Sequence, residues 1–215
     1  MKTILCYGDS LTFGANPVTG GPRHAYEDRW PTALERGLGG KARTIAEGLG
    51  GRTTVFDDWY TDADSNGSRI LPTLLRSHQP LDMVIIMLGT NDLKPFLGRT
   101  AQEAANGMRR LVQIIRAHAA AENLDVPEIV LMAPPALCDS PNDDMMEHFG
   151  RHEAIAQSKL FAKWYAQRAK EVGAHFFDAG TVAKADPRDG VHLDAENTRA
   201  IGTGLVPLVK SILSL

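Results

Sequence analysis

Five short runs of apolar residues along the chain have the length and composition of buried β-strands. Each run is followed within a few residues by glycine, proline or a polar cluster that would end a strand. The clearest run, 82–88, contains the continuous sequence Met-Val-Ile-Ile-Met-Leu, which is typical of a strand buried on both faces of a parallel sheet. The predicted strands are 3–7, 42–46, 82–88, 128–132 and 174–177.

Between these runs, apolar residues recur at the three- and four-residue spacing of amphipathic helices. In the longest such segment, 100–122, Thr100 is followed three residues later by Glu103, which is the pattern of a capping box. In the segment 69–78, Pro72 predicts a helix that begins late. The predicted helices are 28–38, 69–78, 100–122, 152–172 and 194–213, with long loops at 50–68 and 136–150.

The predicted strands and helices alternate along the chain. Such alternation predicts a parallel sheet with right-handed crossovers and helices on both faces. A chain of 215 residues is long enough for one domain of this kind, and it contains no internal repeat or low-complexity linker. We therefore expect an α/β protein with a single domain over residues 1–215, built as a flavodoxin-like three-layer α/β/α sandwich around a five-stranded parallel sheet.

Composition narrows the classes of partner. The chain has 23 basic and 26 acidic residues, a net charge of −3, and no long basic face, so we expect no nucleic-acid partner. No apolar segment approaches the ~20 residues that span a membrane, and we find no secretory signal at the N-terminus. The only two cysteines are Cys6 and Cys138, a usage that suits a reducing compartment. These features predict a cytoplasmic protein.

Four polar or glycine-rich segments follow apolar runs and carry catalytic residue types. In an open parallel sheet, ligands bind outside the carboxyl ends of the strands, so we expect these segments to converge on one crevice. They are Gly8-Asp9-Ser10-Leu11, Gly48-Leu49-Gly50-Gly51, Gly89-Thr90-Asn91-Asp92 and Asp189-Gly190-Val191-His192.

Three residues of these segments predict an acyl-transfer site. A serine hydroxyl such as that of Ser10 becomes a good nucleophile only when a neighbouring base removes its proton. His192 is the natural base, because the ordinary pKa of histidine suits proton transfer near neutral pH. Asp189, three residues earlier, can reach the ring Nδ1 of His192 and fix its tautomer.

An oxyanion that develops on the substrate carbonyl needs fixed hydrogen-bond donors. Asn91 can offer its side-chain amide, and Gly51 can offer a backbone N–H that no side chain obstructs. The backbone N–H of Ser10 would be the third donor. Each segment alone is also compatible with an ordinary turn, and their combination favours the catalytic interpretation.

The four segments together resemble the conserved blocks of the SGNH (GDSL) hydrolases, in the same order and over nearly the whole chain. The resemblance implies that Ser10 is the nucleophile, His192 the base and Asp189 its partner, with Ser10, Gly51 and Asn91 as the oxyanion hole. One departure is Gly50, where many members have serine; we expect a softer loop that keeps the donor.

The segments 5–7, 48–54 and 85–90 are most similar to the bacterial arylesterase and acyltransferase branch of that family. This resemblance implies a preference for short acyl groups such as acetyl, and assembly into oligomers that partly roof the site. We therefore expect a serine esterase acting on short-chain esters of small alcohols, aryl alcohols or sugars, with possible acyl transfer to alcohols and no cofactor or metal. A lysophospholipase or thioesterase remains an alternative within the same class.

Other classes fit the sequence less well. An ordinary α/β-hydrolase needs Gly-x-Ser-x-Gly, but Thr12 stands at the second glycine. The glycines near residues 8–14 and 48–53 match neither a P-loop nor a dinucleotide fingerprint. His148 and His152 have a helical metal-ligand spacing but lack the accompanying glutamate. A non-catalytic small-ligand or carbohydrate-binding module on the same fold is the remaining alternative, although it would not need an activated nucleophile.

The substrate pocket is the least defined part of the sequence. Leu11, Trp59 and Phe149 are its candidate walls, together with Met145 and Met146 in the 136–155 region. Each is also compatible with simple packing. Phe56, Trp59 and Tyr60 could instead form a contact between subunits, because exposed aromatics would make an apolar patch. We expect a homo-oligomer.

Overall fold

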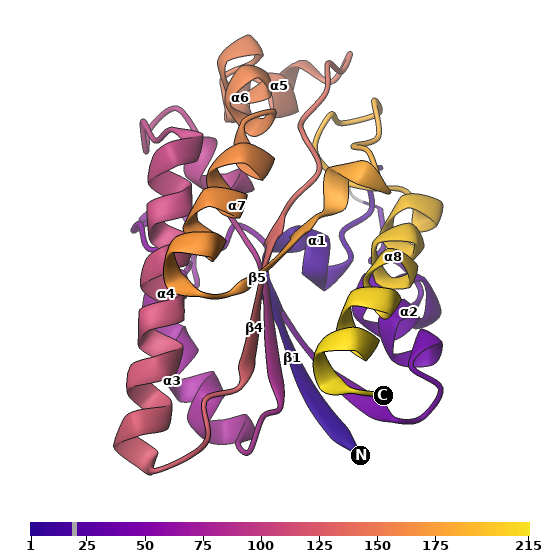
Figure 1. The fold of residues 1–215 in the computed structure, drawn as a ribbon. Helices are drawn as coiled ribbons and strands as arrows, with labels where there is room; N and C mark the ends of the chain where they lie inside the picture. Colours follow the sequence, from indigo (N-terminus) through magenta and orange to yellow (C-terminus); the bar gives the residue numbers. More distant parts are fainter. Residues whose placement is uncertain (19–20) are drawn as a thin grey trace.

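The computed structural model describes residues 1–18 and 21–215 (Figure 1). Its centre is a five-stranded sheet with the strand order β2-β1-β3-β4-β5, in which every neighbouring pair is parallel. This confirms the predicted α/β fold class. The strands are Lys2–Gly8 (β1), Ala42–Gly48 (β2), Met83–Met87 (β3), Glu128–Ala133 (β4) and His175–Asp178 (β5).

Helices cover both faces of the sheet and form the two outer layers (Figure 1). One layer contains α3, α4 and α7, and the other contains α2 and α8. The short helices α5 and α6 lie beyond the carboxyl ends of the strands, together with α1. The helices are Ser10–Phe13 (α1), Trp30–Gly37 (α2), Gly67–His78 (α3), Ala101–Glu122 (α4), Asp143–Phe149 (α5), His152–Ser158 (α6), Phe161–Val172 (α7) and Ala195–Leu213 (α8).

Successive side chains of β1 point to opposite faces of the sheet, and each face packs against its own helical layer to form a hydrophobic core. Leu5 and Tyr7 pack against the α3, α4 and α7 layer, whereas Ile4 and Cys6 pack against α2 and α8. All four side chains are fully buried. Burial of a large apolar side chain contributes about 1.5–3 kcal/mol, so the central strands hold the sheet rigidly under its carboxyl edge.

The structure differs from the sequence-based prediction in two helical regions. Helix α3 begins at Gly67, earlier than expected, because the Asn66 side chain accepts the backbone N–H of Ser68 and caps it. Pro72 lies inside this helix. The predicted loop 136–150 contains α5, and the predicted helix 152–172 is divided into α6 and α7. The break follows Ser158, whose hydroxyl accepts the backbone N–H of Leu137 and holds the helix end against that segment.

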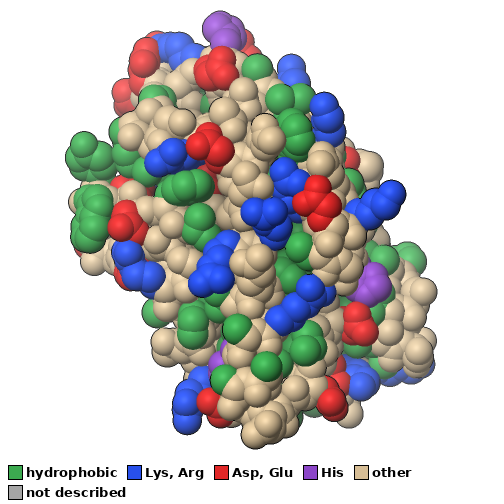
Figure 2. Space-filling view, turned by 60° about the vertical axis from the view of Figure 1, so that its left-hand side comes forward, with side chains coloured by type: hydrophobic (Ala, Val, Ile, Leu, Met, Phe, Trp, Pro, Cys, Tyr) green, Lys and Arg blue, Asp and Glu red, His purple; other side chains and the backbone are tan. Residues whose placement is uncertain are grey.

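Charged side chains of both signs share the face of the molecule that Figure 2 shows. On this face, Lys and Arg side chains are interspersed with Asp and Glu side chains. Within the described residues, no helix is both long and apolar enough to cross a membrane.

Candidate active site

Ser10 lies where the first strand gives way to a helix. The Asp9 side chain caps α1 by accepting the backbone N–H of Leu11 at 2.9 Å, which makes Ser10 the first helical residue. A Cβ atom on Gly8 would come within 2.0 Å of the Thr12 hydroxyl, so only glycine permits this close approach. The turn places the half-buried Ser10 side chain at the carboxyl edge of the sheet.

Asp189, His192 and Ser10 form a continuous hydrogen-bonded chain. Asp189 Oδ2 lies 2.6 Å from His192 Nδ1, and Asp189 Oδ1 accepts the backbone N–H groups of Val191 and His192 at 2.9 and 2.8 Å. Because a carboxylate can only accept, the His192 proton lies on Nδ1 and leaves Nε2 as an acceptor. His192 Nε2 lies 3.0 Å from Ser10 Oγ. The arrangement can withdraw a proton from the serine hydroxyl.

The ends of three strands lie at one level, which brings the other predicted site segments to the same edge. Gly8 at the end of β1 pairs in register with Gly48 of β2 and with Met87 of β3. Gly51 and Asn91 follow these two partners by a few residues. Neighbouring strands are about 4.8 Å apart, so both segments lie beside the Ser10 turn.

The buried Asn91 side chain contacts both the Ser10 turn and the segment that follows Gly51. Its Nδ2 donates to the backbone oxygen of Arg52 at 3.1 Å and, more weakly, to Asp9 Oδ2 at 3.4 Å. Gly51 has a φ of 80°, a left-handed conformation that favours glycine, although a Cβ atom there would meet nothing closer than 3.7 Å. The requirement at Gly51 is therefore conformational rather than a lack of space.

Two further bridges fasten the Asn91 segment to the segment that follows Gly51. Asp92 accepts the backbone N–H of Thr54 at 3.0 Å and also the Thr54 hydroxyl. Lys94 Nζ lies 2.9 Å from Asp58 Oδ2, and the side chains of this ion pair are only 5% and 1% exposed. Both candidate oxyanion donors thus belong to one braced unit.

Arg52 links this unit to the strands. Its Nη1 donates to the backbone oxygens of Gly8, at 2.8 Å, and Glu47, and its guanidinium lies over the Tyr7 ring at 4.4 Å. Arg52 is 4% exposed. The sequence does not predict the contacts of Arg52, Asp92 and Lys94. The only signal for them is that each is a charged residue close to a predicted site residue.

Burial changes the acidity of two carboxyl groups beneath the site. Burial raises the pKa of Asp9 to about 6, against the opposing effects of the Leu11 N–H and of the His192 and Arg52 charges. Burial also raises the pKa of Asp92 to about 7, although the Thr54 hydroxyl and N–H lower it. These groups therefore change their protonation near neutral pH.

A cavity of about 290 Å³ opens beside His192. Most of its wall comes from residues within 13–18 and 21–23, and Met145 contributes from α5. Its lining includes the side chains of Phe13, Val18, Arg23, Met145, Asp189 and His192.

The structure does not bring the three predicted pocket residues to this cavity. Leu11 is buried in the core beside α2 and α8, because it lies on the inner side of α1. Phe149 is buried in the other core. Trp59 is 80% exposed and lies under the Arg69 guanidinium. Of the additional candidates, Met145 lines the cavity, whereas Met146 is buried.

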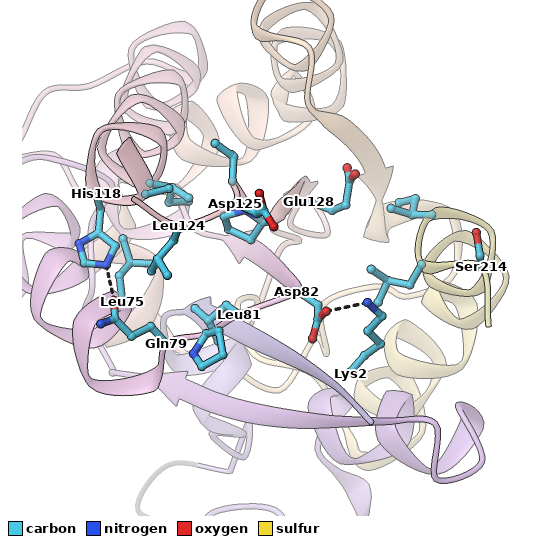
Figure 3. A pocket seen from close by; sticks show the side chains of 17 residues that line it. Lys2, Leu75, Gln79, Leu81, Asp82, His118, Leu124, Asp125, Glu128 and Ser214 are labelled. Atoms are coloured by element: carbon cyan, nitrogen blue, oxygen red, sulfur yellow. Dashed lines mark hydrogen bonds and ion pairs between the residues drawn. The ribbon is translucent and has the colours of Figure 1, made fainter. Parts of the chain in front are cut away.

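A larger cavity, of about 500 Å³, lies at the opposite end of the sheet (Figure 3). Lys2 and Asp82 form an ion pair in its wall at 2.7 Å, and His118 contacts Gln79 at 3.1 Å. These residues lie at the amino ends of the strands, far from the Ser10 turn. In the described part of the chain, no three His, Cys, Asp or Glu side chains are grouped so that they could hold a metal ion.

An open parallel α/β sheet with a serine, histidine and aspartate chain at its carboxyl edge is the arrangement of a serine hydrolase, and Asp and His on one loop separate it from the ordinary α/β-hydrolases. The chain belongs to the GDSL-like lipase/acylhydrolase family, whose model matches residues 6–199. It is a carboxylic ester hydrolase of this type. A comparison with curated proteins gave no significant match.

Solved structures with the same fold cover the whole chain. A carbohydrate acetylesterase family member from Sinorhizobium meliloti is 50% identical, with a TM-score of 0.95 and full coverage of both chains. Est24, a carbohydrate acetylesterase from the same organism, is 40% identical, with a TM-score of 0.93 over 99% of this chain and 100% of its own. The native aryl esterase of M. smegmatis is 37% identical, with a TM-score of 0.93 and the same coverage.

Proposed function

We propose that the protein is a serine esterase that cleaves short-chain esters, above all acetyl esters, through an acyl-enzyme on Ser10. The observation that carries this proposal is the hydrogen-bonded chain from Ser10 through His192 to Asp189, with distances of 3.0 and 2.6 Å. The similarity to carbohydrate acetylesterases and an aryl esterase supports acetyl esters of sugars and aryl alcohols as the substrates.

In the first half-reaction, Ser10 Oγ attacks the ester carbonyl while His192 Nε2 takes the hydroxyl proton. The Asp189 carboxylate stabilises the imidazolium that forms. The carbonyl oxygen becomes an oxyanion, which the N–H groups of Ser10 and Gly51 and the amide of Asn91 stabilise. The weaker of the two Asn91 hydrogen bonds, 3.4 Å to Asp9, is the one that the oxyanion can replace.

The tetrahedral intermediate then collapses. The bond between the carbonyl carbon and the alcohol oxygen breaks, and the His192 imidazolium gives its proton to the departing alcohol. In the second half-reaction, His192 removes a proton from water, which attacks the acyl carbon. The bond between this carbon and Ser10 Oγ then breaks, and His192 returns the proton to Ser10 Oγ as the acid leaves. A second alcohol in place of water would yield a new ester, so the same site can transfer the acyl group.

Hydrolysis of p-nitrophenyl acetate tests this function and separates it from a binding module. The wild type should release p-nitrophenol, and Ser10→Ala should lose nearly all of this activity. Ser77→Ala, an exposed serine on α3, is the matched control and should keep it. Equal turnover by wild type and Ser10→Ala would contradict the proposal. Release of butyrate or longer acids at the rate of acetate would contradict the short-chain preference.

We further propose that the exposed aromatics of the 56–60 segment form a contact between copies of the chain. Trp59 and Tyr60 are 80% and 83% exposed, and the Tyr60 ring packs edge-on against Phe96 at 4.9 Å. An apolar surface of this kind is costly in water. Sedimentation should show an oligomer for the wild type and a monomer for the double variant Trp59→Ser/Tyr60→Ser. A monomeric wild type would contradict this.

We also propose a cytoplasmic location, which the two free thiols of Cys6 and Cys138 support.

A further inference from the structure

Phe13, Gly14 and His24 are held close to Ser10 and His192. Phe13 is the last residue of α1, the helix that Ser10 begins. The backbone N–H of His24 donates to Gly14 O at 2.8 Å, and the buried His24 ring contacts the backbone oxygen of Leu193 at 2.8 Å. Leu193 directly follows His192. The residue before His24 is therefore held close to both ends of the Ser10 to His192 hydrogen bond.

That residue is Arg23, and one side of its guanidinium already contacts Phe13. The Arg23 Nε donates to the backbone oxygen of Phe13, and the guanidinium carbon lies 3.9 Å from the centre of the Phe13 ring. The stacked ring covers one face of the planar group, and the Nε hydrogen bond fixes its rotation. The two Nη groups form the remaining edge, which matches the two oxygens of a carboxylate.

Within the described residues, no carboxylate forms an ion pair with this edge. Among residues 1–18 and 21–215, no acidic side chain lies within ion-pair distance of Arg23 or of the neighbouring Arg29. Partial burial lowers the pKa of Arg23, and the positive charge of Arg29 lowers it further. Asp189 also lines the cavity, but its oxygens already accept from His192 and from two backbone N–H groups.

The cavity beside Arg23 adjoins His192, the residue that protonates the departing alcohol in the proposed reaction. Its walls include His192 and Asp189 but neither Gly51 nor Asn91, the candidate oxyanion donors. In the proposed reaction, His192 must lie within hydrogen-bond reach of the leaving oxygen. In this orientation the alcohol part of the ester extends toward Phe13 and Arg23.

We propose that Arg23 is a specificity-determining residue that binds a carboxylate on the alcohol part of the substrate. The preferred substrates are then acetyl esters of phenols or alcohols, sugar acids included, that carry a carboxylate. This inference rests on the proposed esterase function and deepens it. An unneutralised, oriented guanidinium at the leaving-group side favours such substrates both in the ground state and as the alcohol departs.

Two aryl acetates that differ in one charge test the inference. 4-Acetoxybenzoate carries the carboxylate, and methyl 4-acetoxybenzoate is its neutral counterpart. The quantity measured is the ratio of their kcat/KM values, determined for each protein. Comparing this ratio between proteins cancels the different intrinsic reactivities of the two esters. Arg23→Gln should lower the ratio about tenfold relative to the wild type, the size expected for a hydrogen bond between charged groups.

Arg110→Gln is the matched control, because it makes the same change of net charge at an exposed position on α4. It should keep the wild-type ratio. An unchanged ratio in Arg23→Gln, or an equal fall in Arg110→Gln, would overturn the assignment of Arg23 while leaving the esterase function intact. Failure of the wild type to hydrolyse either ester would instead contradict the proposed function.

Discussion

Arg52 Nη1 donates a hydrogen bond to the backbone oxygen of Gly8 at 2.8 Å, and the two residues belong to different segments of the site. Gly8 precedes the Ser10 turn, and Arg52 directly follows Gly51. The backbone oxygen of Arg52 in turn accepts from Asn91 Nδ2 at 3.1 Å. A single residue thus connects the Ser10 turn with both of the other candidate oxyanion donors, and it is not among the residues that line the cavity beside His192.

Replacement of Arg52 by glutamine should lower kcat more than it changes KM. The donors would lose their fixed positions, and a misplacement of the order of 1 Å can cost about 10²-fold in rate. Steady-state kinetics on p-nitrophenyl acetate measure this, with thermal denaturation to show that the variant is folded. Arg43→Gln, at the exposed amino end of β2, is the control. A folded Arg52→Gln protein with wild-type kcat would exclude the positioning role.

Asp189→Asn should leave the fold intact and lower kcat by about 10⁴-fold, because an amide at this place favours the wrong His192 tautomer. The same kinetic assay, together with circular dichroism, checks both parts of the prediction. Asp186→Asn changes an acid on the same loop that pairs with Arg188, and it should have a much smaller effect. Comparable activity of Asp189→Asn and the wild type would remove Asp189 from the mechanism.

The buried pair of Lys94 and Asp58 should be far more sensitive to the loss of one partner than to the loss of both. Lys94→Met leaves a buried carboxylate unpaired, and we expect it to lower the free energy of unfolding by about 3–5 kcal/mol. Lys94→Met with Asp58→Leu should recover much of this loss. Urea denaturation measures both variants.

An exposed pair provides the comparison for this experiment. Arg99 and Glu103 lie 3.3 Å apart with side chains about 40% exposed, so Arg99→Met should cost less than about 1 kcal/mol. A Lys94→Met protein as stable as the wild type would show that the pair does not brace the Asn91 segment.

The raised pKa of Asp92 predicts how stability depends on pH. Its folded pKa of about 7 lies above the ordinary value of 3.8, so the folded protein binds a proton that the unfolded chain has lost. This contribution to stability is complete below the unfolded pKa and is lost as pH rises toward about 7. Asp92→Asn should therefore flatten the pH dependence of unfolding in this window, by about 1.4 kcal/mol per pH unit.

Urea denaturation at a series of pH values measures this slope. Asp62→Asn, which makes the same chemical change at an exposed position, should keep the wild-type slope. If the Asp92→Asn and wild-type slopes agree, Asp92 does not titrate differently in the folded and unfolded states.

Local pattern was sufficient to predict the sheet and the segments that carry Ser10, Asn91 and His192. Their convergence follows from a general property of parallel sheets, whose carboxyl ends share one edge. The sequence pattern does not reveal helix α5, because a helix of seven residues is too short to show a clear periodicity of apolar positions. The only local signal is Asn142, which caps its start.

The bracing contacts could not be predicted in the same way. Arg52 to Gly8, Asp92 to Thr54 and Lys94 to Asp58 each join residues that lie on different segments, so only the register of the strands brings them together. Leu11, a predicted wall of the substrate pocket, does not line the cavity beside His192 for a related reason. The orientation of a side chain on a one-turn helix depends on the core that it meets, and Leu11 meets the α2 and α8 layer.

Covalent labelling tests the central claim most directly. An organophosphate such as diethyl p-nitrophenyl phosphate reacts with a serine that a neighbouring base activates, and mass spectrometry locates the adduct. We expect one diethylphosphoryl group on the peptide that contains Ser10 in the wild type, and no adduct on that peptide in His192→Ala. An unlabelled Ser10 in active wild-type enzyme, or equally fast labelling of Ser10 in His192→Ala, would contradict the account.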